Sequence, residues 1–114
     1  MTENLTAPPA VVQEFLTAHA ARDAAGTLRT LTPDAVVRDD GAVHRGADEI
    51  ASWLRRASSE YSWSSTLTGT ERVDDAHWVT THRLVGDFPG GVVDLAYRFT
   101  LRGGLVCALT IEPC

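Results

Sequence analysis

A carboxylate at the end of an apolar segment is the clearest chemical feature of this sequence. Asp39 follows Ala35 and Val37 in a stretch whose composition predicts a β-strand. Successive side chains of a strand point to opposite faces, so Asp39 shares a face with Ala35 and Val37. If that face points inward, the carboxylate can accept a proton from a carbon next to a carbonyl group. The alternative is that Asp39 and Asp40 only start a turn at Gly41, a common role of aspartate.

A tyrosine and a histidine also fall on apolar faces of predicted elements. Tyr97 alternates with Phe99 in the strand predicted over 92–101, so its hydroxyl is expected inside, where it can donate one hydrogen bond. The alternative is a core aromatic whose hydroxyl finds a backbone carbonyl. His19 lies on the apolar face of the first predicted helix. Such histidines are either satisfied core residues or pocket residues that titrate near neutral pH.

Another histidine and two tryptophans complete the candidate pocket. Trp78 and His82 share one face of the strand predicted over 76–86, and we place His82 toward the interior. Alternation alone does not fix this orientation, because both faces of that strand carry apolar groups. Trp53 and Trp63 are expected in the core or at the mouth of a pocket.

The histidines and cysteines do not form a metal-site or nucleophile pattern. His77 and His82 are five residues apart, which places them on opposite faces of a strand. Cys107 lies in an apolar run without an obvious basic partner, and no Gly-x-Ser-x-Gly motif or phosphate loop occurs. We therefore expect neither a metal nor another cofactor.

Composition limits the partners that the chain can take. Its 114 residues suit one domain, and its net charge of −5 comes with ten scattered arginines and no lysine. Nucleic acid and anionic membrane surfaces call for clustered positive charge, so neither is expected as a partner. The N-terminus has no basic start followed by an apolar run, and no apolar stretch reaches the roughly 18 residues of a membrane span. We expect a cytoplasmic protein with reduced thiols.

The first third of the chain predicts a tail and two helical segments. Residues 1–7 are expected to form a flexible tail, and a helix to begin near Pro8 and end near Asp23. The apolar face of this helix carries Val12, Phe15, Leu16, His19 and Ala20. A short helical piece is predicted over Thr27–Leu31, because the residue before Pro33 avoids the helical conformation.

The rest of the chain predicts a hairpin, a third helix and a run of strands. Ala35–Asp39 and Val43–Arg45 are the expected hairpin strands, and Gly46 begins a helix with acidic residues in its first turn. After residue 60 the period changes to two. Four long strands with short links predict an antiparallel meander in an α+β fold. We expect a single domain over residues 8–114.

Three stretches carry a resemblance to a known superfamily: Val11–Asp23, Pro33–Ile50 and Phe99–Ile111. In element order and local sequence, they resemble the nuclear transport factor 2-like superfamily, which includes ketosteroid isomerases and SnoaL-like polyketide cyclases. The likeness covers residues 8–113. It implies a cystatin-like cone, in which a strongly bent antiparallel sheet wraps around three helices of the N-terminal half and encloses an apolar pocket. It also implies a homodimer through the outer face of the sheet.

The same resemblance implies roles for individual residues. The general base of the isomerases is an aspartate near the end of the first strand, a position that Asp39 matches. Their second, protonated aspartate matches Tyr97, and the tyrosine of their first helix matches Phe15, which has no hydrogen-bond donor. Loss of one such donor typically lowers the rate about 10²–10³-fold, which argues against a steroid-type isomerisation.

Two functions follow as hypotheses. The first is an isomerase- or cyclase-like enzyme that moves a proton on a small apolar or polycyclic molecule, with Asp39 as base and Tyr97 as hydrogen-bond donor. Its expected pocket residues are Phe15, His19, Val37, Trp53, Trp63 and His82. The second is a non-catalytic ligand-binding or dimerisation module of the same fold. Arg83 and Asp94 also supply part of the Asp-Arg-Asp arrangement of limonene-epoxide-hydrolase-like relatives, but the last strand lacks a second matching aspartate.

Overall fold

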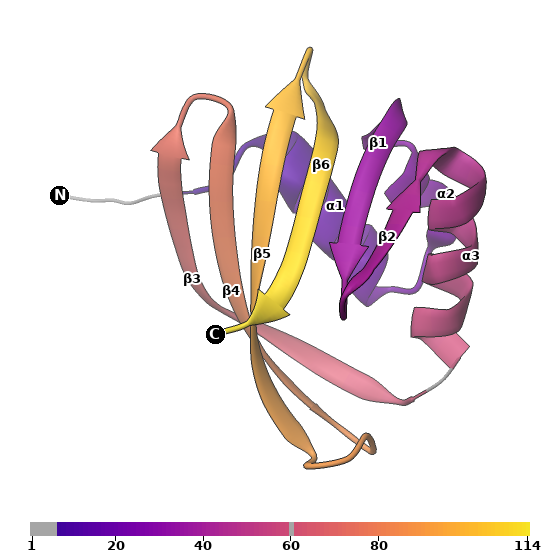
Figure 1. Ribbon diagram of the computed structural model, residues 1–114. Coiled ribbons are helices and arrows are strands. Elements are labelled where there is room, and N and C mark those ends of the chain that lie inside the picture. The colour runs from indigo at the N-terminus through magenta and orange to yellow at the C-terminus, as the bar shows by residue number, and fades with distance from the viewer. Residues whose placement is uncertain (1–6, 60) are drawn as a thin grey trace, which may run out of the picture.

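A mixed α+β fold of three helices and one six-stranded sheet is seen in the computed structural model, which describes residues 7–59 and 61–114 (Figure 1). The predicted tail thus lies, apart from Ala7, outside the described residues. The helices are α1 (Ala10–Ala20), α2 (Ala24–Leu28) and α3 (Gly46–Ser59). The strands are β1 (Leu31–Asp39), β2 (Ala42–Arg45), β3 (Trp63–Asp74), β4 (His77–Gly86), β5 (Val92–Arg102) and β6 (Leu105–Pro113).

The sheet is curled but not closed, with strand order β2-β1-β6-β5-β4-β3. The predicted antiparallel meander is confirmed for β3 to β6, and β1 and β2 form the expected antiparallel hairpin. The sheet as a whole is mixed, because β1 pairs with β6 in parallel, with Val37 opposite Leu109 and Asp39 opposite Ile111. Side-chain alternation identifies strands but does not identify their neighbours, which is why the sequence did not predict this pair.

The prediction of a helical piece over Thr27–Leu31 was wrong in its position. Helix α2 ends at Leu28, and the chain then pairs with β6, where the Val106 amide donates to the Thr30 carbonyl at 2.8 Å. Strand β1 begins at Leu31 and passes through Pro33 with a register shift before Val36. Proline in a strand is confined to places where its missing N–H is not needed, and the irregular stretch of β1 is such a place.

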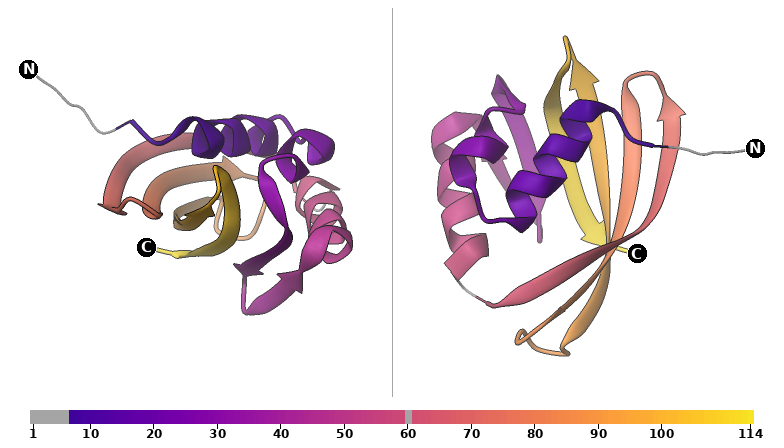
Figure 2. Two further views of the ribbon diagram at one scale, coloured as in Figure 1. Left: turned by 90° about the horizontal axis from the view of Figure 1, so that it is seen from above. Right: turned by 180° about the vertical axis from the view of Figure 1, so that it is seen from behind.

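Helix α1 lies across the concave face of the sheet, while α2 and α3 lie beside β1 and β2 (Figure 2). Val12, Phe15 and His19 are the buried residues of α1, as its apolar periodicity predicts. Phe15 meets Phe99 of β5 edge-to-face, with 5.4 Å between ring centroids. Other fully or almost fully buried apolar side chains are Val37, Ile50, Val106 and Leu109. The core therefore joins α1 to the middle of the sheet.

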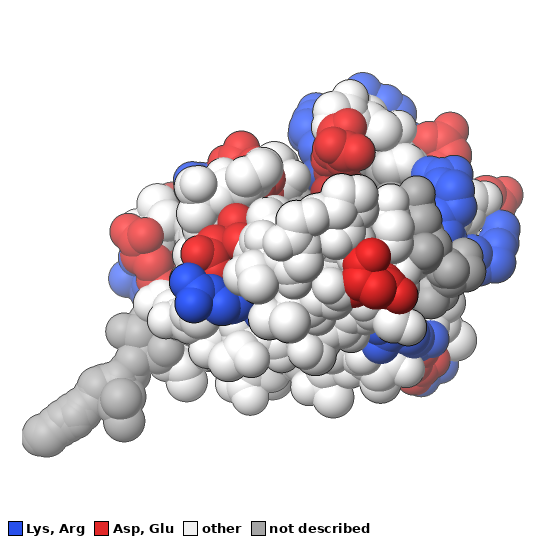
Figure 3. Space-filling model, turned by 90° about the horizontal axis from the view of Figure 1, so that it is seen from below, with Lys and Arg blue, Asp and Glu red and all other residues white. Residues whose placement is uncertain are grey.

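Charged side chains are mixed in sign on the face of the molecule seen from below, where acidic and basic groups lie scattered among uncharged ones (Figure 3). Among the described residues, no helix is both long enough and apolar enough to cross a membrane.

The N-terminal cap of α2 can be tested by mutation. The Asp23 side chain accepts a hydrogen bond from the Gly26 amide at 2.9 Å and caps the helix. We expect Asp23→Ala to lower the free energy of unfolding by about 1 kcal/mol, because the cap bond is lost. Urea unfolding measures the change. Asp23→Asn, which keeps an acceptor oxygen, should retain most of the stability, and equal losses in the two variants would contradict the capping role.

Candidate functional site

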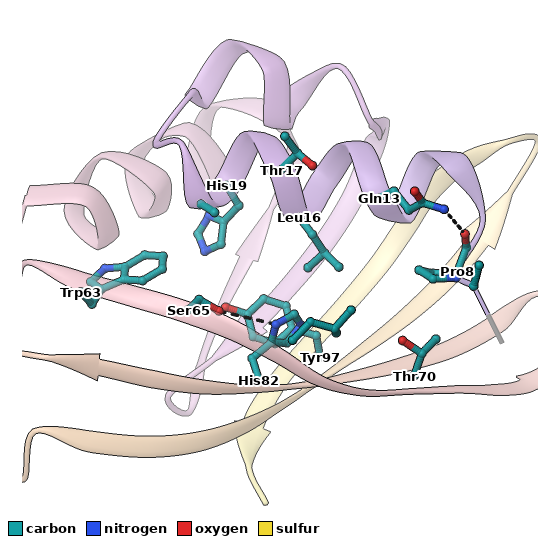
Figure 4. Close-up of a pocket in the computed structure, with 13 residues that line it drawn as sticks. Pro8, Gln13, Leu16, Thr17, His19, Trp63, Ser65, Thr70, His82 and Tyr97 are labelled. Atoms are coloured by element: carbon teal, nitrogen blue, oxygen red, sulfur yellow. Dashed lines mark hydrogen bonds between the residues drawn. The ribbon is translucent and has the colours of Figure 1, made fainter. Parts of the chain in front are cut away.

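A cavity of about 560 Å³ lies between α1 and the concave face of β3, β4 and β5 (Figure 4). Helix α1 provides one wall and the strands provide the other. Lining residues from these elements include Leu16, His19, Trp63, Ser65, Leu67, His82 and Tyr97. Cavities of this size hold small organic molecules in other proteins.

Strand alternation aims the polar groups of β4 and β5 into this cavity. Thr80 and His82 of β4 are buried on the inner face, and Tyr97 and Phe99 of β5 lie on the same side of the sheet. Thr80 and Tyr97 are direct cross-strand partners, which brings the neighbouring His82 ring to 4.7 Å from the Tyr97 ring, centroid to centroid. The structure therefore places the His82 side chain on the inner face of the sheet.

The Tyr97 hydroxyl is a protonated donor at the cavity wall. Tyr97 is 4% exposed, and among the described residues its hydroxyl makes no hydrogen bond. Burial raises the pKa of Tyr97 far above its ordinary value, and the negative charge of Asp39 raises it further. The hydroxyl is thus free to donate to a molecule in the cavity.

His82 is a neutral imidazole at neutral pH. Its Nε2 atom lies 2.8 Å from the Thr80 hydroxyl, and its Nδ1 atom lies 3.5 Å from the Ser65 hydroxyl on the cavity side. Burial lowers the pKa of His82 from its ordinary value of 6.5. Thr80 is fully buried, so it holds one edge of the ring in a fixed position.

His19 is a second neutral histidine, and it lies at the boundary between the cavity and the core. Burial, then the positive charge of Arg22, then His82 lower the pKa of His19 to about 4. Its ring stacks on Trp53 at 5.6 Å between centroids and lies 5.6 Å from the Trp63 ring. Since the lining contains no aspartate, glutamate, lysine or arginine among the described residues, the cavity carries no formal charge at neutral pH.

Arg22, just after the end of α1, contacts Trp63 at the start of β3. Its guanidinium lies over the Trp63 ring at 4.6 Å from the centroid and donates to the Trp63 carbonyl at 2.9 Å. Arg22 has a φ of 59°, in the left-handed region, so the end of α1 turns sharply toward β3. The link fixes the start of β3 against the helix.

Asp39 lies at the indole N–H edge of Trp53, whose ring stacks on His19. Its Oδ2 atom accepts a hydrogen bond from the Trp53 indole at 2.9 Å. Burial raises the pKa of Asp39, and Asp40 raises it further, while the Trp53 bond and His44 act in the opposite direction. The Asp39 side chain thus points inward and is partly buried, as strand alternation predicts. It is not among the cavity-lining residues.

The sequence matches the SnoaL-like domain over residues 12–109. The chain belongs to the SnoaL-like family. No curated protein matches it at the sequence level.

Solved structures of the same fold agree with this assignment. A proposed polyketide cyclase from Sinorhizobium meliloti is 31% identical, with a TM-score of 0.86 over 92% of this chain and 95% of that one. A ketosteroid isomerase-like protein from Catenulispora acidiphila, solved with trimethylamine, is 18% identical, with a TM-score of 0.81 over 93% and 86%. A cystatin-fold protein from Novosphingobium aromaticivorans is 14% identical, with a TM-score of 0.76 over 90% and 94%. The second and third likenesses show the fold alone, and the non-catalytic alternative is not favoured by the comparisons.

The predicted pocket residues of this SnoaL-like domain separate into two groups. His19, Trp63, His82 and Tyr97 line the cavity together. Phe15, Val37 and Trp53 lie in the core beside it, each at most 5% exposed. Trp53 is 5% exposed and its indole is bonded to Asp39, so its side chain belongs to the core and not to the cavity lining.

The sequence analysis missed several residues of the site. Leu16 and Leu67 line the cavity, and both stand in apolar patterns that the sequence already displays. Ser65 and Thr80 contact the two nitrogens of His82, and no sequence signal distinguishes them from the other hydroxyl residues of β3 and β4.

The Arg83 and Asp94 pair lies outside the site. Arg83 donates to Asp94 at 2.9 and 3.2 Å on the outer face of the sheet, where both side chains are exposed. They therefore do not form the core of an Asp-Arg-Asp arrangement in the interior.

A test of the environment of Asp39 follows from the direction of its pKa shift. A carboxyl group whose pKa is raised by folding supports the folded state when protonated, and that contribution is lost as pH rises through the folded-state pKa. Asp39→Asn stays uncharged and keeps an oxygen that accepts from Trp53. We expect the free energy of unfolding of this variant to exceed that of the wild type by on the order of 1 kcal/mol at pH 7. The difference should vanish below the ordinary aspartate pKa of 3.8.

Urea unfolding at pH 7 and pH 3 measures this difference. The matched control is Asp40→Asn, which removes the same charge from an exposed neighbour in the turn. Equal effects of the two variants at pH 7, or a loss of stability in Asp39→Asn, would refute the assignment.

Proposed function

We propose that this SnoaL-like domain is an enzyme that moves a proton within a small, neutral cyclic carbonyl compound, without a cofactor. The observation that carries the proposal is the Tyr97 hydroxyl, which is protonated, without a partner among the described residues, and located at the wall of an apolar cavity. A donor in this state can stabilise the negative charge that forms on a carbonyl oxygen when a neighbouring carbon loses a proton.

The lining of the cavity favours an apolar and uncharged ligand. Leu16, Trp63 and Leu67 provide apolar surface, and the polar lining groups are hydroxyls, an amide and two neutral imidazoles. A charged ligand would lose its hydration without gaining an ion-pair partner from the lining, which is costly. A flat ring system with a carbonyl or enol group matches this set of contacts.

The relatives support the same class of reaction. The Sinorhizobium protein that is 31% identical to this chain is a proposed polyketide cyclase, and ring closure of that type begins with proton removal next to a carbonyl. We therefore assign this chain to isomerase- or cyclase-type chemistry.

The contribution of Asp39 to the proposed function is electrostatic. The carboxylate is bonded to the Trp53 indole outside the cavity lining, and its negative charge adds to the effect of burial in raising the pKa of Tyr97. The role of general base, which the superfamily resemblance implies for Asp39, stays a prediction.

The Tyr97→Phe variant tests the proposed function. The probe is 2-tetralone, a neutral bicyclic ketone, and the measurement is exchange of its α-hydrogens in D₂O, followed by NMR. We expect the protein to accelerate exchange over buffer, and Tyr97→Phe to lower the rate about 10²–10³-fold, because the hydrogen bond to the enolate oxygen is lost. Binding of the probe should change much less.

The matched control is Tyr61→Phe, which removes a hydroxyl from an exposed tyrosine. It should exchange the probe at the wild-type rate. Wild-type protein that gives no acceleration, or Tyr97→Phe that keeps the full rate, would overturn the proposed function.

We also propose a homodimer through the outer face of the sheet. This face combines the Arg83–Asp94 ion pair with Val85 and Val92, which are opposite each other in the strand register. Both valines are about half exposed in the protomer, at 50% and 54%. Apolar side chains between charged pairs are typical of a surface that a second subunit can cover.

Light scattering after size exclusion tests the dimer. We expect a mass of twice the chain's 12.3 kDa, and a shift toward the single chain in Val92→Asp. The control Val43→Asp changes a valine of β2, which is 42% exposed at the opposite end of the strand order, and should leave the mass unchanged. A single-chain mass for the wild type at all concentrations would exclude the dimer.

A further inference from the structure

We propose that His82, oriented by the buried hydroxyl of Thr80, is the group that takes the substrate proton, in place of the Asp39 carboxylate. This inference rests on the proposed function and assigns its base. The two side chains differ in position: His82 lines the cavity and Asp39 does not. A base has to come within hydrogen-bond distance of the proton that it removes.

The surroundings of the His82 ring make its two nitrogens unequal. The Nε2 atom is 2.8 Å from the Thr80 hydroxyl, in a region closed to solvent. The Nδ1 atom is 3.5 Å from the Ser65 hydroxyl, a long and weak contact at the cavity wall. In the tautomer in which Nε2–H donates to Thr80, Nδ1 presents its lone pair on the cavity side. Thr80 is thus a positioning residue, and His82 is the catalytic one.

The neighbouring donor completes the geometry. The Tyr97 and His82 rings lie 4.7 Å apart, centroid to centroid, and both residues line the cavity. A ketone presents the same pair of groups, a carbonyl oxygen next to a carbon that carries acidic hydrogens. The oxygen can face Tyr97 while the adjacent C–H faces His82.

The reaction step is balanced within these groups. Nδ1 takes the proton, the C–H electron pair becomes the C=C bond of an enolate, and the carbonyl electron pair moves to the oxygen that Tyr97 binds. The imidazolium then returns the proton to the same carbon or to another carbon of the conjugated system. No oxidant, reductant or second substrate is required.

Burial favours the neutral form of His82, and the titratable groups that face its ring are themselves uncharged at neutral pH. His19 faces it from α1 and is itself uncharged at neutral pH, and Tyr97 faces it from β5 in the protonated state. Arg22 and Asp39 act on these two neighbours, since Arg22 lowers the pKa of His19 and Asp39 raises the pKa of Tyr97. The contacts from β3 are Ser65 and Leu67, which do not titrate.

Exchange of 2-tetralone α-hydrogens in D₂O by the full-length protein tests the inference. We expect His82→Gln to lower the rate about 10²–10⁴-fold, the usual contribution of a general base, while the probe still binds. His77→Gln is the matched control, because His77 is an exposed histidine on the outer face of the same strand. In His82→Ala, imidazole added to the buffer should restore part of the lost rate.

Nitrogen-15 NMR of the histidine rings supplies a readout that does not depend on activity. We expect the His82 signals of the wild type to show a protonated Nε2 and an unprotonated Nδ1 at pH 7. Thr80→Val should disturb this tautomer and lower the exchange rate about tenfold, whereas a merely structural role of Thr80 would leave the tautomer unchanged.

The outcomes separate the two proposals. If the wild type accelerates exchange and His82→Gln retains the rate while Asp39→Asn loses it, the base is Asp39 and this inference is overturned, although the proposed function stands. A His82 ring protonated at Nδ1 also overturns the inference. If the wild type does not accelerate exchange, the proposed function and the inference fall together.

Discussion

The packing of His19 between the core and the cavity is the contact on which the rest of the site depends. His19 stacks on Trp53, lies beside Trp63 and Tyr97, and continues the apolar face that Phe15 begins. These ring contacts fix α1 against the concave face of the sheet. They make His19 part of both the buried core and the cavity wall.

This contact also explains why the site is uncharged. A histidine buried among aromatic rings cannot keep a proton at neutral pH, because burial and the nearby Arg22 oppose the charged form. Burial likewise lowers the pKa of His82, because it disfavours the cationic form. Burial raises the pKa of Tyr97, because it disfavours the anionic form. The interior therefore favours the neutral form of each of these three groups, which leaves hydrogen bonding and proton transfer as its available chemistry.

Much of the fold follows from the sequence, because it rests on periodicities. The spacing of Val12, Phe15 and His19 predicts the buried face of α1, and alternation predicts that Tyr97 and Phe99 point inward. The parallel pairing of β1 with β6 was not predictable in this way, because it joins segments about 70 residues apart. The Trp53–Asp39 bond and the Thr80–His82 bond were missed for the same reason, since tertiary packing selects each pair.

Polar side chains of this fold lie in two places, one beside the Trp53 indole and the other in the cavity. The superfamily resemblance implies a base at Asp39 and a donor at Phe15, but here the Trp53 indole binds the Asp39 carboxylate and Phe15 has no hydrogen-bond donor. A polar pocket at that end would require both a free carboxylate and a donor on α1. The donor and acceptor groups of this chain lie instead on β4 and β5, where Tyr97 and His82 face the cavity. Asp39 still influences this second group of residues, because its negative charge raises the pKa of Tyr97.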